Sequence, residues 1–213
     1  MKKYHLFLSI GILLSLFLTA CSETEDAASE FENWQERNET YFNNIYNRAK
    51  SGSSDLKTFT KWSINDAAAT NADDHIVVQV LESGSGSGCP MYTDSVQIHY
   101  RGRLMPSSTY ADGYVFDQSY TGTFNKATLK PVSKAVSAFV DGLTTALMNM
   151  HIGDHWRVYI PYNLGYGTTP PSSSGIPAYS TLIFDIALVA YYRPGADVPD
   201  WKAKTSNRFW IDE

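Results

Sequence analysis

The chain has 213 residues, with 17 lysine and arginine residues against 22 aspartate and glutamate residues and a formal net charge of −5. This acidic balance, without a basic run, argues against nucleic-acid binding, because proteins of that class neutralise phosphates with clustered lysine and arginine. The length is sufficient for one core of ordinary size with extensions.

The first 20 residues, 1–20, have the pattern of a signal peptide. Lys2 and Lys3 supply the positive charge, and residues 6–18 form an apolar stretch. This stretch is shorter than the about 20 residues that a membrane-spanning helix needs, but it fits a secretory signal. No second membrane-spanning candidate follows, because the longest apolar stretch, 182–192, is interrupted by Asp185.

A cysteine, Cys21, directly follows this segment. Residues 18–21 resemble the bacterial lipobox, in which the cysteine becomes the lipidated first residue, and polar residues 22–26 follow. We expect lipidation at Cys21, residues 21–28 as a tether, and a lipid-anchored protein of the bacterial cell envelope that faces the periplasm or the surface. The acidic residues after Cys21 favour the outer membrane over the inner one. The alternative is an ordinary signal peptide with a chance cysteine.

Residues 29–70 are predicted to form an N-terminal helical extension. Ser29 and Glu32 have the spacing of a capping box, and the helix is expected to end near Lys50, before a Gly/Ser run. This aromatic helix is expected to pack on the chain's own domain, and the alternatives are a homodimer through the helix or contact with a client protein. The residues that share its aromatic face are Phe31, Trp34, Tyr41, Phe42 and Ile45.

From about His75 the pattern changes to strands. Strands with one apolar face around a single short helix predict an α+β domain, in which an antiparallel twisted sheet wraps on that helix. Residues 192–213 are expected to form a tail whose aromatic side chains dock on the domain or on the N-terminal helix. The β-rich or alternating runs are 76–81, 96–101, 114–117, 155–160 and 182–188, and the short helical pattern comprises Phe139, Val140, Leu143 and Leu147.

The sequence offers little for metal or nucleophilic chemistry. His151 and His155 have the spacing of metal ligands on a helix, but residues 153–154 between them are typical of a turn, so we expect no metal. The chain has no phosphate-binding loop and no serine-nucleophile motif. With Cys21 acylated only Cys89 remains, so no intrachain disulfide is expected.

Several short motifs follow one another in a known order. Together they resemble the FKBP-type peptidyl-prolyl cis-trans isomerases, and the resemblance covers residues 74–191. It implies an FKBP-like fold, isomerisation of Xaa-Pro bonds in exported proteins, proline-containing polypeptides as partners, and no cofactor. The motifs stand at residues 98–102, 115–119, 152–154, 160–161, 164–167, 175–177 and 180–185.

The same resemblance implies which residues form the pocket. A dry aromatic cavity built from them would act by enclosing its substrate rather than by attacking it. The catalytic residues it implies are Tyr100, Phe116, Asp117, Tyr166 and Phe184. The substrate-binding residues it implies are Phe139, Val140, Leu143 and Ile176.

Two positions depart from the family pattern. Leu143 stands where the family often has a tryptophan on the pocket floor, and Ala138 stands where an acidic residue often precedes the Phe-Val pair. A smaller floor makes fewer contacts, so a catalytically weak peptide-binding chaperone or holdase is the alternative function, and a purely structural lipoprotein is the third. Extended loops at 105–112 and 119–127 are expected to surround the cavity, and the loop that contains residues 170–174 is also elaborated.

Overall fold

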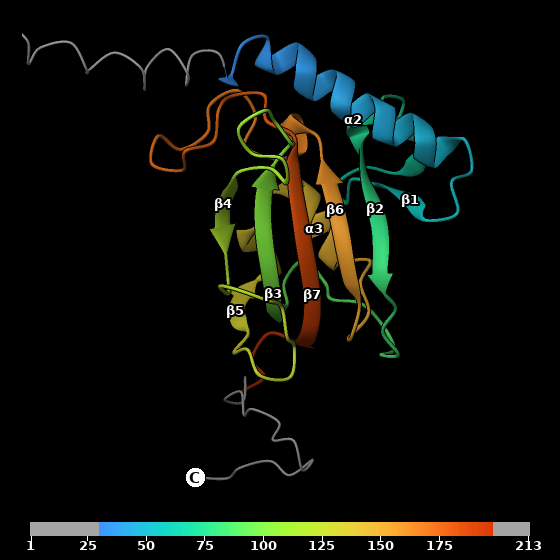
Figure 1. Cartoon of the computed structure of the whole chain (residues 1–213). Helices are drawn as coiled ribbons and strands as arrows, with labels where there is room; N and C mark the ends of the chain where they lie inside the picture. Colours follow the sequence, from blue (N-terminus) through green and yellow to red (C-terminus); the bar gives the residue numbers. More distant parts are fainter. Residues whose placement is uncertain (1–29, 198–213) are drawn as a thin grey trace, which may run out of the picture. The chain divides into compact units, whose positions relative to one another are not determined.

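The computed structural model of the chain describes residues 30–197 (Figure 1). The chain divides into two compact units, Met1–Asn33 and Trp34–Glu213, and the fold below is that of the second unit. The predicted signal peptide, the lipidation at Cys21, the tether and the Ser29 cap lie outside the described residues, as does the tail beyond Asp197. In the described part of the chain, no helix combines the length and the apolar character needed to span a membrane.

An antiparallel sheet of seven strands forms the centre of this unit (Figure 1). Its order is β1-β2-β6-β7-β3-β4, and β5 also pairs with β3. The five predicted strands are present, which confirms the α+β class, and β1 and β5 are strands that the sequence pattern did not predict. The strands are β1 (Leu56–Thr60), β2 (His75–Glu82), β3 (Ser95–Leu104), β4 (Val115–Gln118), β5 (Val132–Ala135), β6 (His155–Ile160) and β7 (Leu182–Tyr192).

Helix α3 (Asp141–Leu147) packs on one face of the sheet, the inner face (Figure 1). Because side chains alternate across a strand, Val96, Ile98 and Tyr100 of β3 point to the same face, and all three are buried. They form the main core together with Leu143 and Leu147 of α3. The predicted wrapping of the sheet on a short helix is thus confirmed.

Helix α2 (Trp34–Lys50) packs on the outer face of the sheet, over β1 and β2 (Figure 1). Phe42 and Ile45 of the helix form a second apolar cluster with Leu56 and Val77. Val77 reaches this cluster because it points away from the inner face, to which its two strand neighbours contribute. Helix α2 therefore packs on Val77, the residue of this part of β2 that does not belong to the main core.

The helix begins later than predicted. Residues 31–33 form a turn, and Asn33 has a φ of 50°, a left-handed conformation that interrupts an α-helix. Phe31 therefore precedes α2 and does not belong to its buried face. The buried residues of α2 are Trp34, Asn38, Phe42 and Ile45.

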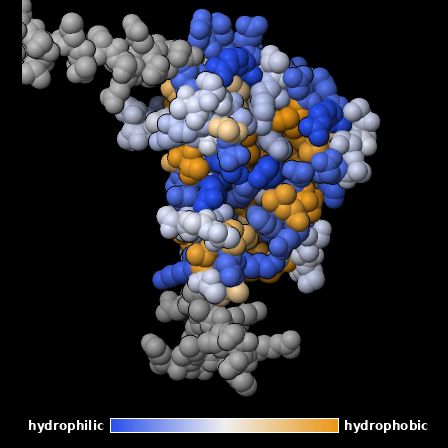
Figure 2. Space-filling view, in the orientation of Figure 1, coloured by the Kyte–Doolittle hydropathy of each residue, from blue (hydrophilic) through white to orange (hydrophobic). Residues whose placement is uncertain are grey.

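The aromatic face of α2 packs on the chain's own domain, as expected. Phe42 and Ile45 of this face contact the sheet, and a homodimer or a client contact through the helix stays a prediction. Figure 2 shows hydrophobic residues on the viewed face only in small separate groups between hydrophilic ones. The segment predicted as a helical extension also contains strand β1, which pairs with β2 along its whole length.

One of the extended loops lies elsewhere than predicted. Tyr120 and Phe124 of loop 119–127 pack against His99, with ring centroids 6.5 and 5.6 Å away. His99 follows the strand alternation and points to the outer face, opposite to its neighbour Tyr100. The loop therefore covers the outer face of the sheet near His155 rather than surrounding a cavity on the inner face.

A buried polar side chain fastens α2 to the loop before β7. Asn38 is fully buried. Its Nδ2 donates to the Trp34 carbonyl at 2.7 Å, and its Oδ1 accepts the Thr181 N–H at 2.8 Å. The Trp34 indole N–H donates to the Ser180 hydroxyl at 2.9 Å. These bonds fix the position of α2 with a directionality that apolar packing lacks.

We predict that Asn38→Ala lowers the free energy of unfolding by about 1–3 kcal/mol, because it leaves the buried Thr181 N–H without its acceptor. Urea unfolding measures this loss. Asn44→Ala, at an exposed position of the same helix, is the matched control and should change stability by less than about 0.5 kcal/mol. Equal losses in both variants would contradict the role given to Asn38.

Candidate functional site

A cavity of about 240 Å³ lies between the inner face of the sheet and the first turn of α3. Its walls are mainly aromatic and apolar, with one carboxylate and one amine. Among these lining residues of the described chain there is no serine, cysteine or histidine. The lining residues are Tyr100, Asp117, Lys134, Ala138, Phe139, Val140, Leu143, Tyr166 and Phe184.

The aromatic wall of the cavity depends on Gly102 of β3. The strand register pairs Gly102 with Phe184 of β7 on one side and with Asp117 of β4 on the other. A Cβ atom at this position would lie 2.7 Å from the rings of both Phe116 and Phe184. The two rings meet over the glycine edge to face, with their centroids 5.5 Å apart.

A tyrosine and an aspartate are joined across this wall. The Tyr100 hydroxyl donates to Asp117 Oδ2 at 2.8 Å, and the Tyr100 ring lies 6.2 Å from that of Phe184. Burial, and after it the hydrogen bond to Asp117, raises the pKa of Tyr100 well above its usual value. Tyr100 therefore keeps its proton, and that proton holds the Asp117 side chain in place.

Tyr166 enters the cavity from a tight turn. It follows the 3₁₀ turn η4 (Tyr162–Leu164), and the next residue, Gly167, has a φ of 64° that permits its N–H to donate to the Tyr162 carbonyl at 2.8 Å. Burial, with a smaller effect of the Asp117 carboxylate, raises the pKa of Tyr166. The Tyr166 hydroxyl makes no hydrogen bond within residues 30–197, so a neutral donor is available to a ligand.

The start of α3 supplies the floor of the cavity. The Val140 carbonyl accepts the N–H groups of Leu143 and Thr144 at 2.9 and 3.0 Å. The Val140 N–H itself makes no hydrogen bond to any described residue, since it precedes the first helical turn. Leu143 is 1% exposed and also lines the cavity. The floor therefore combines an apolar surface with a second available donor.

Seven of the nine pocket residues implied by the sequence line this cavity. Phe116 is not among the lining residues and packs edge to face on Phe184, and Ile176 is buried in the main core with 6% exposure. Lys134 was not predicted, because β5 is short and has no alternating pattern; its Nζ lies 5.7 Å from the centre of the Phe139 ring. Ala138, which the sequence analysis noted only as a departure from the family pattern, also lines the cavity.

The chain is similar in sequence to proteins of a known family. Residues 86–189 match the family model described as FKBP-type peptidyl-prolyl cis-trans isomerase. The macrophage infectivity potentiator of Trypanosoma cruzi is 30% identical over 189 residues, which cover 89% of this chain and 85% of that protein. The outer membrane protein MIP of Legionella longbeachae is 36% identical over 114 residues, or 53% of this chain and 42% of that protein.

A solved structure shows the same similarity. The crystal structure of a peptidyl-prolyl cis-trans isomerase from Pseudomonas syringae pv. tomato matches with a TM-score of 0.53 and 26% identity, and the match covers 76% of this chain and 96% of that one. By contrast, the chain spans less than half the length of several curated bacterial relatives. The residues matched by the family model, 86–189, include β3 to β6, most of β7, α3 and the residues that line the cavity.

We predict that Gly102→Ala lowers the free energy of unfolding by about 1–3 kcal/mol, because the new methyl group displaces two packed rings. The double variant Gly102→Ala/Phe116→Leu should recover part of this loss, since one of the two colliding rings is replaced by a smaller side chain. Thermal unfolding followed by near-ultraviolet circular dichroism measures both. If the loss of stability in the double variant equals the sum of the losses in Gly102→Ala and Phe116→Leu, the predicted clash between the new methyl group and the Phe116 ring is contradicted.

Proposed function

The chain belongs to the FKBP-type peptidyl-prolyl cis-trans isomerase family, and we propose that it isomerises Xaa-Pro bonds of exported proteins in the bacterial cell envelope. The observation that supports this most strongly is the cavity of mainly aromatic and apolar side chains, where two lining residues, Tyr166 and Val140, each have a donor (Oη and N) without a partner among the described residues. Such a site can bind and enclose a substrate without a covalent step.

The physical chemistry of the amide explains why enclosure is sufficient. Rotation about the peptide bond meets a barrier of about 18–20 kcal/mol, and an Xaa-Pro bond isomerises unaided in tens to hundreds of seconds. Resonance separates charge between nitrogen and oxygen in the planar amide, and the twisted amide loses this separation. A cavity with little water stabilises the less polar twisted form relative to the planar form.

Each part of the site has a distinct role in this proposal. Phe184, against which Phe116 packs edge to face, contacts the proline ring. Tyr166 Oη–H and Val140 N–H donate to the carbonyls that flank the rotating bond. Because Tyr100 already donates its proton to Asp117, this pair fixes the wall beside the substrate carbonyl rather than transferring a proton.

The cellular place of the reaction rests on the N-terminal pattern. A lipid on Cys21 would anchor the chain to a membrane, with residues 21–28 as the tether, and proline-containing polypeptides in the envelope would be the substrates. The Legionella relative is named as an outer membrane protein, which supports the outer membrane over the inner one. The acidic chain has no basic run for nucleic acid.

A catalytically weak peptide-binding chaperone is the second candidate. Leu143 favours it, because a leucine in place of a tryptophan leaves a smaller contact surface under the proline ring. A proline-limited refolding assay separates the two functions. A chaperone of this kind would bind Xaa-Pro peptides but would not accelerate their isomerisation.

We predict that Tyr166→Phe lowers kcat/KM for an Xaa-Pro tetrapeptide by roughly tenfold, which corresponds to about 1.4 kcal/mol of lost transition-state hydrogen bonding. Tyr162→Phe, which removes a hydroxyl four residues earlier and outside the cavity, is the control and should leave kcat/KM unchanged. A coupled isomerisation assay measures both. The role of Tyr166 would be disproved by equal rates in the two variants.

We predict that Leu143→Trp lowers KM for the same peptide severalfold, because the indole adds contact area to the floor. Its insertion at a buried position should also reduce the free energy of unfolding by about 1–3 kcal/mol. Leu143→Met, similar in volume, should change neither quantity appreciably. An unchanged KM in a folded Leu143→Trp protein would show that this residue does not form the floor.

A further inference from the structure

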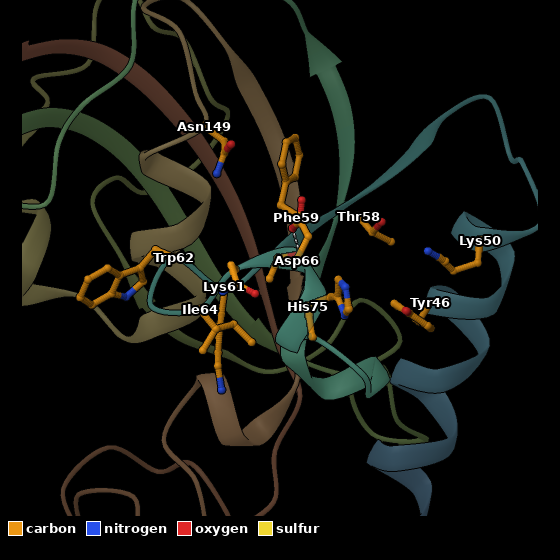
Figure 3. Close-up of a pocket in the computed structure, with 13 residues that line it drawn as sticks. Tyr46, Lys50, Thr58, Phe59, Lys61, Trp62, Ile64, Asp66, His75 and Asn149 are labelled. Carbon is orange, nitrogen blue, oxygen red and sulfur yellow. Dashed lines mark hydrogen bonds between the residues drawn. The ribbon is translucent and has the colours of Figure 1, made fainter.

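A second and larger pocket lies outside the isomerase cavity (Figure 3). Its volume is about 740 Å³, within the range of about 300–1,000 Å³ that ligand sites occupy. Helix α2, strand β1 and the loop after β1 enclose it. Its lining residues are Tyr46, Lys50, Thr58, Phe59, Thr60, Lys61, Trp62, Ile64, Asn65, Asp66, Ala69, His75 and Asn149.

The pocket follows the free edge of the sheet. Strand β1 is the first strand of the sheet order and, among the described strands, pairs only with β2. An edge strand presents backbone N–H and C=O groups that can pair with another chain. Because three consecutive β1 residues line the pocket (58–60), its wall consists partly of this unpaired backbone.

The strand register shows which backbone groups face the pocket. Lys61 N–H donates to the Asp74 carbonyl at 2.9 Å, one position beyond the Thr60–His75 pair. In an antiparallel pair, hydrogen-bonded and non-hydrogen-bonded positions alternate. Thr58 and Thr60 are therefore at non-hydrogen-bonded positions, and their N–H and C=O groups point away from β2.

Side chains from both faces of β1 line the pocket, so it wraps around the strand edge. Thr58 shares the outer face with its cross-strand partner Val77, whereas Phe59 stacks on Trp156 at the inner face, with centroids 5.6 Å apart. His75, the partner of Thr60, also lines the pocket, with its ring 5.4 Å from that of Tyr46. An added strand would thus find side-chain surfaces both above and below it.

Two charged side chains of the pocket, Lys50 and Asp66, form no ion pair with any residue that the structure describes. Lys61 pairs with Asp74 at 3.4 Å, and Asp66 accepts a hydrogen bond from the Thr60 hydroxyl at 2.5 Å. Lys50 forms no ion pair with any residue in 30–197, and Figure 3 shows its side chain extending from α2 toward Thr58. A carboxylate on a bound segment would supply the missing partner.

We propose that this pocket binds an extended, acidic polypeptide segment, which pairs with β1 as an additional strand and places a carboxylate at Lys50. The outward main-chain donors and acceptors of Thr58 and Thr60 can pair with the main chain of another strand, as in other cases of strand addition. Building on the proposed isomerase function, we identify the segment as part of a client polypeptide held outside the isomerase cavity.

Trp62 connects the two sites structurally. Trp62 is one of the residues that line the pocket, its indole N–H donates to the Asp141 carboxylate at 3.3 Å, and its backbone N–H donates to Thr145 Oγ1 at 3.1 Å. Both acceptors belong to α3, whose first turn forms the floor of the isomerase cavity. A client held at β1 is therefore bound next to the helix that contacts its proline.

The test uses the purified full-length chain and a fluorescent ten-residue peptide of alternating valine and threonine with a glutamate at each end. The peptide has no proline, so the isomerase cavity does not select it. Thr58→Pro removes an outward N–H at a position where an edge strand tolerates proline, and its Kd should rise by roughly tenfold or more. Thr58→Val keeps the backbone donor and should bind like the wild type.

Charge and backbone pairing are tested separately. Lys50→Glu should weaken binding severalfold, whereas Lys57→Glu, an equal charge change on β1 outside the pocket, should have a smaller effect. In the unmodified protein, bound peptide should slow amide hydrogen exchange at Thr58 and Thr60. Absence of saturable binding, unchanged exchange at both threonines, or equal effects of the two lysine variants would overturn the proposal.

The two proposals can fail independently. Turnover of a short Xaa-Pro tetrapeptide should be unaffected by Thr58→Pro, because a tetrapeptide is too short to occupy both sites. If the wild type shows no turnover but still binds the proline-free peptide through β1, the isomerase proposal fails and the strand-addition site stands.

Discussion

The pairing of β3 with β7 is the constraint on which the rest of the structure depends. Its register places Gly102 opposite Phe184 and Tyr100 opposite Ile186. Since side chains alternate along a strand, a slip of β3 by one residue would turn Tyr100 to the outer face, away from Phe184, and remove it from the wall of the cavity. Gly102 then allows Phe116 to approach Phe184 over β3. The cavity is thus a direct consequence of strand register and of one missing Cβ.

The two faces of the sheet are covered differently. On the inner face, α3 completes a core and leaves a cavity beside its first turn. On the outer face, α2 and loop 119–127 cover Val77 and His99 with packed side chains. Helix α2 is fastened by Asn38 rather than by apolar packing alone. Its position also leaves the edge of β1 open, so the same helix that covers the sheet forms one wall of the second pocket.

Much of the inner face could be predicted from the sequence, because β3 and β6 alternate apolar and polar residues over six or more positions and β7 is an apolar run interrupted only by Asp185. The pocket residues were predicted from the family resemblance, which rests on the order of the motifs. The periodicity of apolar residues alone does not identify these residues. Strand β1 has only one buried residue, Leu56, and β5 has no alternation, so neither has a pattern that separates a strand from a loop. Asn38 was missed for a similar reason, since apolar periodicity ignores a polar residue whose partners are distant in the sequence. The direction of loop 119–127 depends on the ring contacts of Tyr120 and Phe124, which only the folded chain defines.

The cavity is proposed to work by enclosing an amide, without proton transfer or covalent attack. Both phenols, Tyr100 and Tyr166, have raised pKa values and keep their protons at neutral pH. The most direct test is kcat/KM for an Xaa-Pro tetrapeptide between about pH 6 and pH 9, measured in H₂O and in D₂O. Enclosure predicts acceleration with a flat pH profile and a solvent isotope effect of about 1. A bell-shaped profile with an isotope effect of about 2 or more would show that a proton moves in the transition state and would contradict this mechanism.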